Sequence, residues 1–220
     1  MFEKTKNVTI VVLLFILITG SNVYASGDTQ FWTTGGVSTN IAKDWNLSVD
    51  EEIRFSEEGN IFYHHTNLDL TYSGIADWMD IGICYRQAYS KSSSSGKWSE
   101  EHQPQFNVTF KGILFDCGIK NRTRIGFRDL ESKDMWRLRN KTTIKFPWKL
   151  TKFKIQPYIA DELFFDLSDN GFYRNRIYAG LSYKISNNLK SDLFYVWEID
   201  RGRNWDGIQV IGVSVKIIFE

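Results

Sequence analysis

The chain has 220 residues, of which 42% are hydrophobic, 24% are charged and 15% are aromatic. This composition excludes a disordered or collagen-like chain and, with 2 cysteines, a small disulfide-stabilised scaffold. The 27 basic and 26 acidic residues lack the basic excess of a nucleic-acid binder, so we expect no nucleic-acid partner. The mean hydropathy is too polar for a helical membrane protein. It remains compatible with a membrane β-barrel, in which only alternate residues face lipid.

The first 25 residues have the organisation of a secretory signal peptide. Lys4 and Lys6 precede an apolar run over residues 8–18, and small residues lead to a cleavage site after Ala25. The alternative is an uncleaved anchor, but this apolar core is shorter than the roughly 20 residues that a spanning helix needs. Cleavage removes one acidic and two basic residues, so the expected mature chain has 25 of each.

Beyond residue 30 the hydrophobic pattern repeats every two residues, which is typical of β-strands. Around Leu68, for example, Leu68, Leu70 and Tyr72 alternate with Asp69 and Thr71. No long segment has the 3.6-residue period of a helix. The pattern predicts eleven strands, at residues 31–39, 45–55, 62–72, 78–88, 101–110, 113–127, 134–146, 152–165, 172–184, 189–199 and 207–219.

The length of these strands favours a transmembrane barrel over a soluble sandwich. Most of them have ten or more residues, which is long for a globular protein, where strands of about 5–6 residues are usual. About ten tilted residues suffice to cross a bilayer. Short connections such as 42–44 and 186–188 alternate with longer polar ones such as 89–100 and 200–206. This alternation is expected of an outer-membrane barrel with short periplasmic turns and longer outer loops.

Eleven strands cannot close with every neighbouring pair antiparallel, and bacterial barrels have even strand counts. We therefore predict an all-β, up-and-down antiparallel transmembrane barrel of about ten strands over residues 45–220, with twelve strands as the alternative. Residues 26–44 would form an N-terminal segment, either an extra strand or a plug, after the signal peptide of residues 1–25. Gly35-Gly36 provides a flexible point within that segment.

The two faces of the predicted strands differ in chemistry. The apolar faces carry aromatic residues near many strand ends, as in the interface girdles of outer-membrane barrels. The predicted interface aromatics are Trp45, Trp136, Trp197, Tyr183 and Phe219. Glu51 and Asp161 also fall on the apolar faces, where a β-bulge or a position near the lipid headgroups would accommodate them.

The opposite faces are charged and must point into the lumen, because one Arg at mid-depth in lipid costs about 2–4 kcal/mol. The predicted lumen charge lattice consists of Glu52, Arg54, Asp69, Arg122, Arg124, Arg137, Arg139, Glu162, Arg174, Arg176 and Glu198. We interpret this lattice as a structural network of ion pairs, since buried charges must pair whatever the function. The alternative is a selective path for anions.

The sequence contains no pattern typical of a catalytic or metal site. His64 and His65 point to opposite faces of a strand and cannot easily share one metal ion. There is no G-x-S-x-G, P-loop or H-E-x-x-H motif. His65, placed near an outer loop, is the only candidate base, and no serine is tied to it by spacing. Glu162 and Glu198 are better explained as ion-pair partners than as an acid–base pair. We therefore assign no catalytic residue, metal or cofactor.

Several segments together carry a resemblance to a known family. They are Phe31-Trp32, residues 43–47 and 52–55, Pro157-Tyr158, residues 162–165, Asn175-Arg176 with Gly180 and Tyr183, and residues 193–197. In these segments the chain resembles an uncharacterised bacterial outer-membrane β-barrel family, domain of unknown function 2490. The resemblance implies a barrel in the outer membrane and no known activity. Such barrels often end on an aromatic residue read by the barrel-assembly machinery, whereas here Glu220 follows Phe219.

These patterns predict an outer-membrane β-barrel of a Gram-negative bacterium, serving a structural role or as a narrow passive channel with a charged lumen. Its expected partners are outer-membrane lipids and the barrel-assembly machinery, while any small-molecule ligand is unspecified. Two alternatives belong to other classes. One is a barrel enzyme that modifies outer-membrane lipids, and the other is a soluble periplasmic β-barrel that binds a small apolar ligand.

Overall fold

The computed structural model describes residues 29–130, 134–168 and 171–219. The predicted signal peptide, residues 1–25, lies outside these described residues. Within the described ranges, no helix is long and apolar enough to cross a membrane.

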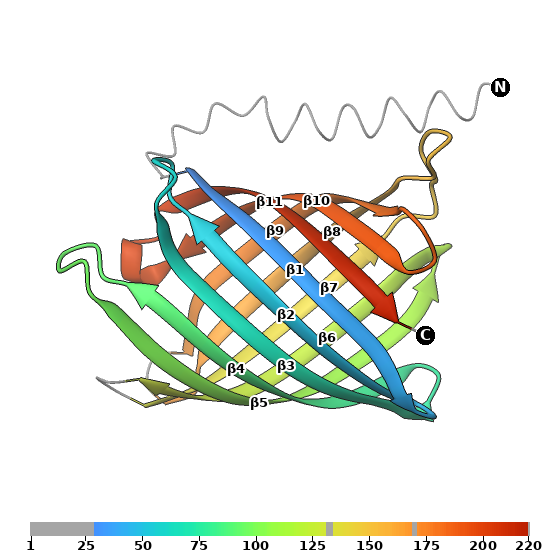
Figure 1. Ribbon diagram of the computed structural model, residues 1–220, viewed down its shortest axis with the longest axis horizontal. Helices are drawn as coiled ribbons and strands as arrows, with labels where there is room; N and C mark the ends of the chain where they lie inside the picture. The colour runs from blue at the N-terminus through green and yellow to red at the C-terminus, as the bar shows by residue number, and fades with distance from the viewer. Residues whose placement is uncertain (1–28, 131–133, 169–170, 220) are drawn as a thin grey trace.

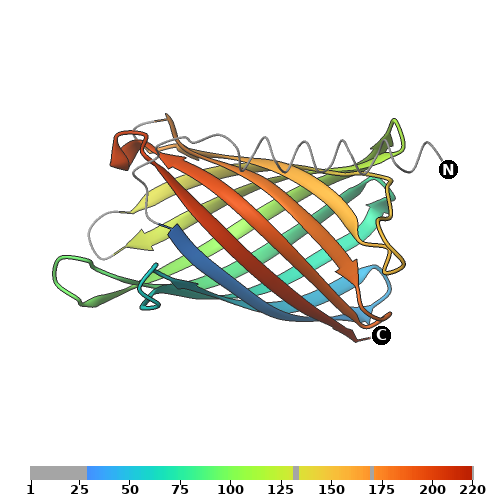
Figure 2. The ribbon, with the colours of Figure 1, turned by 90° about the horizontal axis from the view of Figure 1, so that it is seen from above.

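Eleven strands run side by side around one axis in the described part of the chain (Figures 1 and 2). They are β1 (Thr29–Ala42), β2 (Trp45–Phe55), β3 (Ile61–Ala76), β4 (Met79–Lys91), β5 (Trp98–Leu114), β6 (Cys117–Leu130), β7 (Met135–Lys145), β8 (Gln156–Asp166), β9 (Gly171–Lys184), β10 (Leu189–Asp200) and β11 (Gly207–Phe219). A short 3-10 turn, η1 (Arg201–Arg203), joins β10 to β11. Each predicted strand overlaps one of these.

The strands close into a barrel, so the predicted all-β, up-and-down barrel of about ten strands is confirmed. Consecutive strands pair antiparallel, and a parallel pairing of β1 with β11, from Thr29 opposite Gln209 to Thr39 opposite Phe219, completes the wall. With eleven strands the first and the last run in the same direction. A parallel ladder also pairs backbone groups between the strands. As expected, eleven strands do not close with every pair antiparallel, but one parallel pair lets this barrel close with an odd strand count, so the even-count rule does not hold for this chain.

β1 is a full member of the wall. It pairs along nearly its whole length with β2 on one side and with β11 on the other. The wall thus begins at Thr29, within the segment 26–44 for which the sequence pattern allowed an extra strand or a plug ahead of a barrel over residues 45–220. The pairing of β1 with β11 joins the first and the last described strands, and it leaves no local trace in the sequence.

Two connections differ from the predicted strand bounds. The predicted strands 101–110 and 113–127 leave a tight turn at Lys111-Gly112, but β5 continues through both residues to Leu114. The chain reverses instead at Phe115 and Asp116, which both have positive φ angles, of 49° and 62°. Residues 146–155 form a loop closed by a bridge between Leu150 and Ile155, so β8 begins at residue 156 rather than 152.

Side chains alternate between the lumen and the outside along each strand, as the pleat requires. Most of the outward positions are apolar, but Glu51 and Asp161 point outward as well. No bulge turns them inward, because the register irregularities of β2 and β8 lie elsewhere, at Arg54/Phe55 and Phe164/Phe165. Asp161 accepts a hydrogen bond from the Asn175 amide at 2.6 Å, so neighbouring polar side chains satisfy it on the outer face.

One inward position has room only for glycine. An added Cβ at Gly212 would lie 2.2 Å from ring carbons of Phe194, which packs against the buried cluster formed by Trp32, Val196 and Val210 among others. We expect Gly212→Ala to lower the free energy of unfolding by about 1–3 kcal/mol, the usual effect of overpacking. Urea titration of tryptophan fluorescence would measure it. As a control, Gly35→Ala, where nothing lies within 4 Å of the added Cβ, should have a smaller effect.

Candidate functional site

The lumen contains a cavity of about 230 Å³ whose wall is made chiefly of charged and polar side chains. Its basic lining residues are Arg54, Arg86, Arg122, Arg124, Arg139, Lys141 and Arg176, and its acidic ones are Asp50, Glu52, Asp69 and Glu162. These residues come from β2, β3, β4, β6, β7, β8 and β9. The alternation of each strand directs them inward, and closure of the barrel brings them together.

Glu162 is the most extensively paired carboxylate of the lining, and only 1% of its surface is exposed. One oxygen accepts hydrogen bonds from Arg139, with a shortest distance of 2.6 Å. The other accepts from the Tyr178 hydroxyl at 2.9 Å and lies 3.9 Å from Arg176. Both carboxylate oxygens are thus satisfied inside the barrel, as a buried charge requires.

Glu198 forms a second centre next to the first. It accepts a hydrogen bond from Arg176 at 2.5 Å and another from Arg203 at 2.8 Å, and it lies 3.7 Å from Arg174. Arg174 in turn donates to Asp200 at 2.5 Å. Because Arg176 contacts both Glu162 and Glu198, the two centres form one continuous network.

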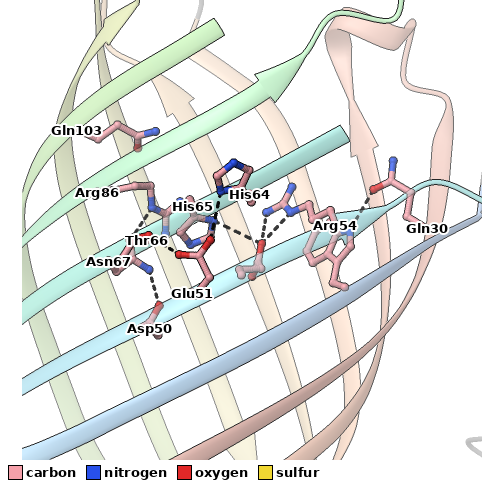
Figure 3. A network of polar contacts seen from close by, with 12 residues as sticks. Gln30, Asp50, Glu51, Arg54, His64, His65, Thr66, Asn67, Arg86 and Gln103 are labelled. Carbon is pink, nitrogen blue, oxygen red and sulfur yellow. Dashed lines mark hydrogen bonds and ion pairs between the residues drawn. The ribbon is translucent and has the colours of Figure 1, made fainter. Parts of the chain in front are cut away.

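A third group of contacts lies on β1–β4 (Figure 3). Arg54 donates to Glu52 at 2.7 Å, and its guanidinium stacks 3.8 Å from the ring centroid of Trp32. Asn67 links two charges, since its amide nitrogen donates to Asp50 at 2.6 Å and its oxygen accepts from Arg86 at 2.7 Å. Polar side chains thus bridge ions that do not touch each other directly.

Toward the loop end of the barrel, which carries connections 56–60, 92–97 and 201–206, buried side chains narrow the lumen. Arg137 donates to Gln103 at 2.5 Å, and Arg128 forms an ion pair with Glu101. Gln103 and Phe164 are each at most 2% exposed. These side chains leave little free space on this side of the cavity.

Residues 29–208, from the start of β1 into β11, match a family model described as a protein of unknown function, DUF2490. The chain belongs to the DUF2490 family. A search among curated proteins finds no match. The family description assigns no activity, so the roles of the residues in this DUF2490 barrel rest on their contacts alone.

The predicted lumen residues all point inward in this DUF2490 member. Eight line the cavity, namely Glu52, Arg54, Asp69, Arg122, Arg124, Arg139, Glu162 and Arg176. Arg137, Arg174 and Glu198 do not line it and belong to the narrowed part beside it. Within residues 29–130, 134–168 and 171–219, Arg122 and Arg137 have no ion pair with a carboxylate within 4.0 Å, and Arg137 contacts Gln103 instead.

The predicted interface aromatics lie on the outer face, near both ends of this DUF2490 barrel. Trp45, Tyr183 and Phe219 lie near the end with tight turns, and Trp136 and Trp197 lie near the loop end. Neighbouring rings accompany several of them. Trp45 lies 4.8 Å from Tyr72 between ring centroids, and Trp136 lies 5.4 Å from Phe127.

His64 and His65 point to opposite faces of β3, as expected. His65, which the sequence placed near an outer loop, is 3% exposed and lines the cavity, whereas His64 lies on the outer face. Extending the alternation of Leu68 and Leu70 back along β3 would have shown this. His64 lies 3.2 Å from Glu51, and Thr66 donates its hydroxyl hydrogen to Glu51 (Figure 3). Among the described residues His64, Glu51 and Thr66, no hydroxyl forms a hydrogen bond to the imidazole of the kind that activates a nucleophile.

Nine lining residues are not part of the predicted lumen charge lattice, namely Trp32, Asp50, His65, Asn67, Arg86, Lys141, Tyr158, Tyr178 and Phe194. Of these, Trp32, Asn67 and Tyr178 contact charged side chains of the lining, but each is a common residue type in an alternating strand. The signal available for Asn67 was its inward parity on β3, which it shares with Asp69. For Trp32 and Tyr178 the parity of their strands was the only signal.

Proposed function

We propose that the protein is an outer-membrane β-barrel whose narrow, charged lumen forms a passive channel for small ions. The observation that carries this proposal is the division of the wall into an apolar outside and an ion-paired inside. Large hydrophobic side chains are exposed on β1–β5 and β7–β11, among them Val49, Ile83 and Leu193. An apolar surface of this extent around a soluble protein would be a liability, whereas lipid would cover it.

The contents of the lumen support a narrow passage rather than an open pore. Buried networks around Glu162 and Glu198 occupy the side of the lumen toward the loop end. A barrel of eleven strands lies between the filled eight-stranded size and the open sixteen-stranded porins. We therefore expect water and small ions to pass, and sugars or peptides to be excluded.

The interior argues against the soluble alternative that binds an apolar ligand. The cavity is lined by eleven charged side chains, and a small apolar molecule would have to desolvate them without replacing their hydrogen bonds. The lipid-modifying alternative lacks a positioned nucleophile at the His64 cluster, as described above.

Fractionation of a Gram-negative host that expresses the full chain tests the membrane location. We expect the protein to sediment with outer membranes and to migrate differently on gels before and after boiling. Planar bilayers containing the purified protein should then show discrete conductance steps smaller than those of sixteen-stranded porins. Recovery in the soluble periplasmic fraction would refute the membrane proposal. Membrane location without conductance would refute the channel and leave a structural barrel.

A further inference from the structure

The inner faces of β6 and β7 carry four basic side chains in a two-by-two block. Arg122 pairs with Lys141 in the strand register, and Arg124 pairs with Arg139 one step further along the same face. Like charges directly opposite each other on a sheet destabilise the strand pair. The pairing of β6 with β7 therefore places like charges opposite each other, and their repulsion is unfavourable for this strand pair.

Ion pairs within 4.0 Å hold only half of this block, although Glu162 also lies opposite Lys141 in the register of β7 and β8. Glu162 contacts Arg139 at 2.6 Å, and Asp69 lies 3.5 Å from Arg124. Within the described part of the chain, Arg122 and Lys141 have no carboxylate within 4.0 Å. The Lys141 ammonium instead lies 3.5 Å from the ring centroid of Tyr178.

All four basic residues line the same cavity of about 230 Å³, whose described lining has seven basic and four acidic side chains. The lining thus has three positive charges more than negative ones. His65 also lines the cavity, and its Nδ1 atom is buried without a hydrogen-bond partner. A cavity with one predominant sign of charge and low-dielectric walls concentrates ions of the opposite sign.

We propose that this cavity binds a small oxyanion of the phosphate class between Arg122 and Lys141. A guanidinium matches two oxygens of such an anion, and an ammonium group supplies a further point charge. Bound negative charge would remove the repulsion between the two strands. Because the block lies inside the closed wall, the anion would come from water and not from a lipid headgroup. The inference rests on the proposed function and deepens it, since it names the solute class that the lumen would recognise.

Isothermal titration of the purified full barrel in detergent with inorganic phosphate tests the site, with sodium chloride at equal ionic strength as the reference. We expect phosphate to bind, and Arg122→Gln and Lys141→Gln each to raise the Kd about tenfold or more, the usual effect of losing a hydrogen bond to a charged group. The matched control is Lys145→Gln, because Lys145 lies on the inner face of β7 but outside the cavity. It should change the Kd less than about twofold, as a distant charge screened by salt would.

Two results would overturn the site. One is the absence of phosphate binding by the unmodified barrel at millimolar concentrations, and the other is an equal weakening by all three substitutions. Arg122→Lys keeps the positive charge but removes the planar guanidinium that can bind two oxygens, so its Kd should be intermediate. This variant provides a second test if a glutamine variant fails to fold. The titration requires no membrane current. Binding without conductance would therefore retain the anion site and reject the channel.

Discussion

Glu162→Gln is expected to destabilise the barrel by about 3–5 kcal/mol, the usual consequence of removing one partner of a buried ion pair. The substitution preserves the shape of the side chain but removes the negative charge between Arg139 and Arg176. It also leaves Lys141, opposite Glu162 in the strand register, with one acid fewer nearby. Solvent water has little access to this position, because Glu162 is only 1% exposed. Hydration therefore cannot compensate the neighbouring arginines for the lost carboxylate.

Urea unfolding of the barrel in detergent, followed by tryptophan fluorescence and by gel mobility, would measure the change. Asp80→Asn is the matched control. Asp80 pairs with Lys111 at 2.7 Å, but the lysine side chain is 38% exposed, so we expect a loss of about 1 kcal/mol or less. Adding Arg139→Gln to Glu162→Gln should recover part of the loss, because fewer buried charges then lack a partner. Equal effects of Glu162→Gln and Asp80→Asn would contradict a structural role for the network.

The alternation of residues in single strands was enough to predict which charges face inward. In β6, Arg122 and Arg124 share a parity, and in β7 so do Arg137 and Arg139. A strand allows only two faces, and lipid or a hydrophobic core excludes one of them for arginine. The same parity rule, applied to β3, would have placed His65 inside.

The choice of partners could not be predicted from the sequence, because it depends on the register between strands. Glu162 contacts Arg176 because β8 and β9 place them opposite each other, whereas a shift of one residue would turn one of them outward. The turn at Phe115-Asp116 shows a similar limit. Neither residue is glycine, and the adjacent Lys111-Gly112 pair offered the stronger local signal.

The seam was the least predictable part of the fold, because it joins the first described strand to the last. β1 and β11 are separated by almost the whole chain, and nothing in either strand specifies a parallel neighbour. The even strand count of known bacterial barrels therefore favours a ten-stranded wall when the sequence is taken alone. Deleting β1 distinguishes the two architectures directly.

Removal of residues 29–42 is expected to abolish the heat-modifiable barrel. β2 and β11 would each lose a ladder of eleven residue pairs. They run antiparallel and could in principle pair with each other in a ten-stranded wall. That wall would enclose a smaller lumen. The networks around Glu162 and Glu198 would then have to fit into less space than they occupy in the eleven-stranded barrel. Unpaired strand edges would otherwise remain, and in the membrane that we propose for this barrel their backbone groups would lack hydrogen-bond partners.

Trp32→Ala gives a graded version of the same test, since it leaves every β1 backbone pair in place. Trp32 is 3% exposed, packs in the buried cluster with Val196 and Val210, and stacks on the Arg54 guanidinium. Its truncation should cost about 3–5 kcal/mol of unfolding free energy. Thr39→Ala near the far end of β1 is the control and should cost under about 1 kcal/mol, as for most surface positions. If the deletion variant still formed a heat-modifiable barrel, ten strands would be sufficient for closure and β1 would be an accessory strand.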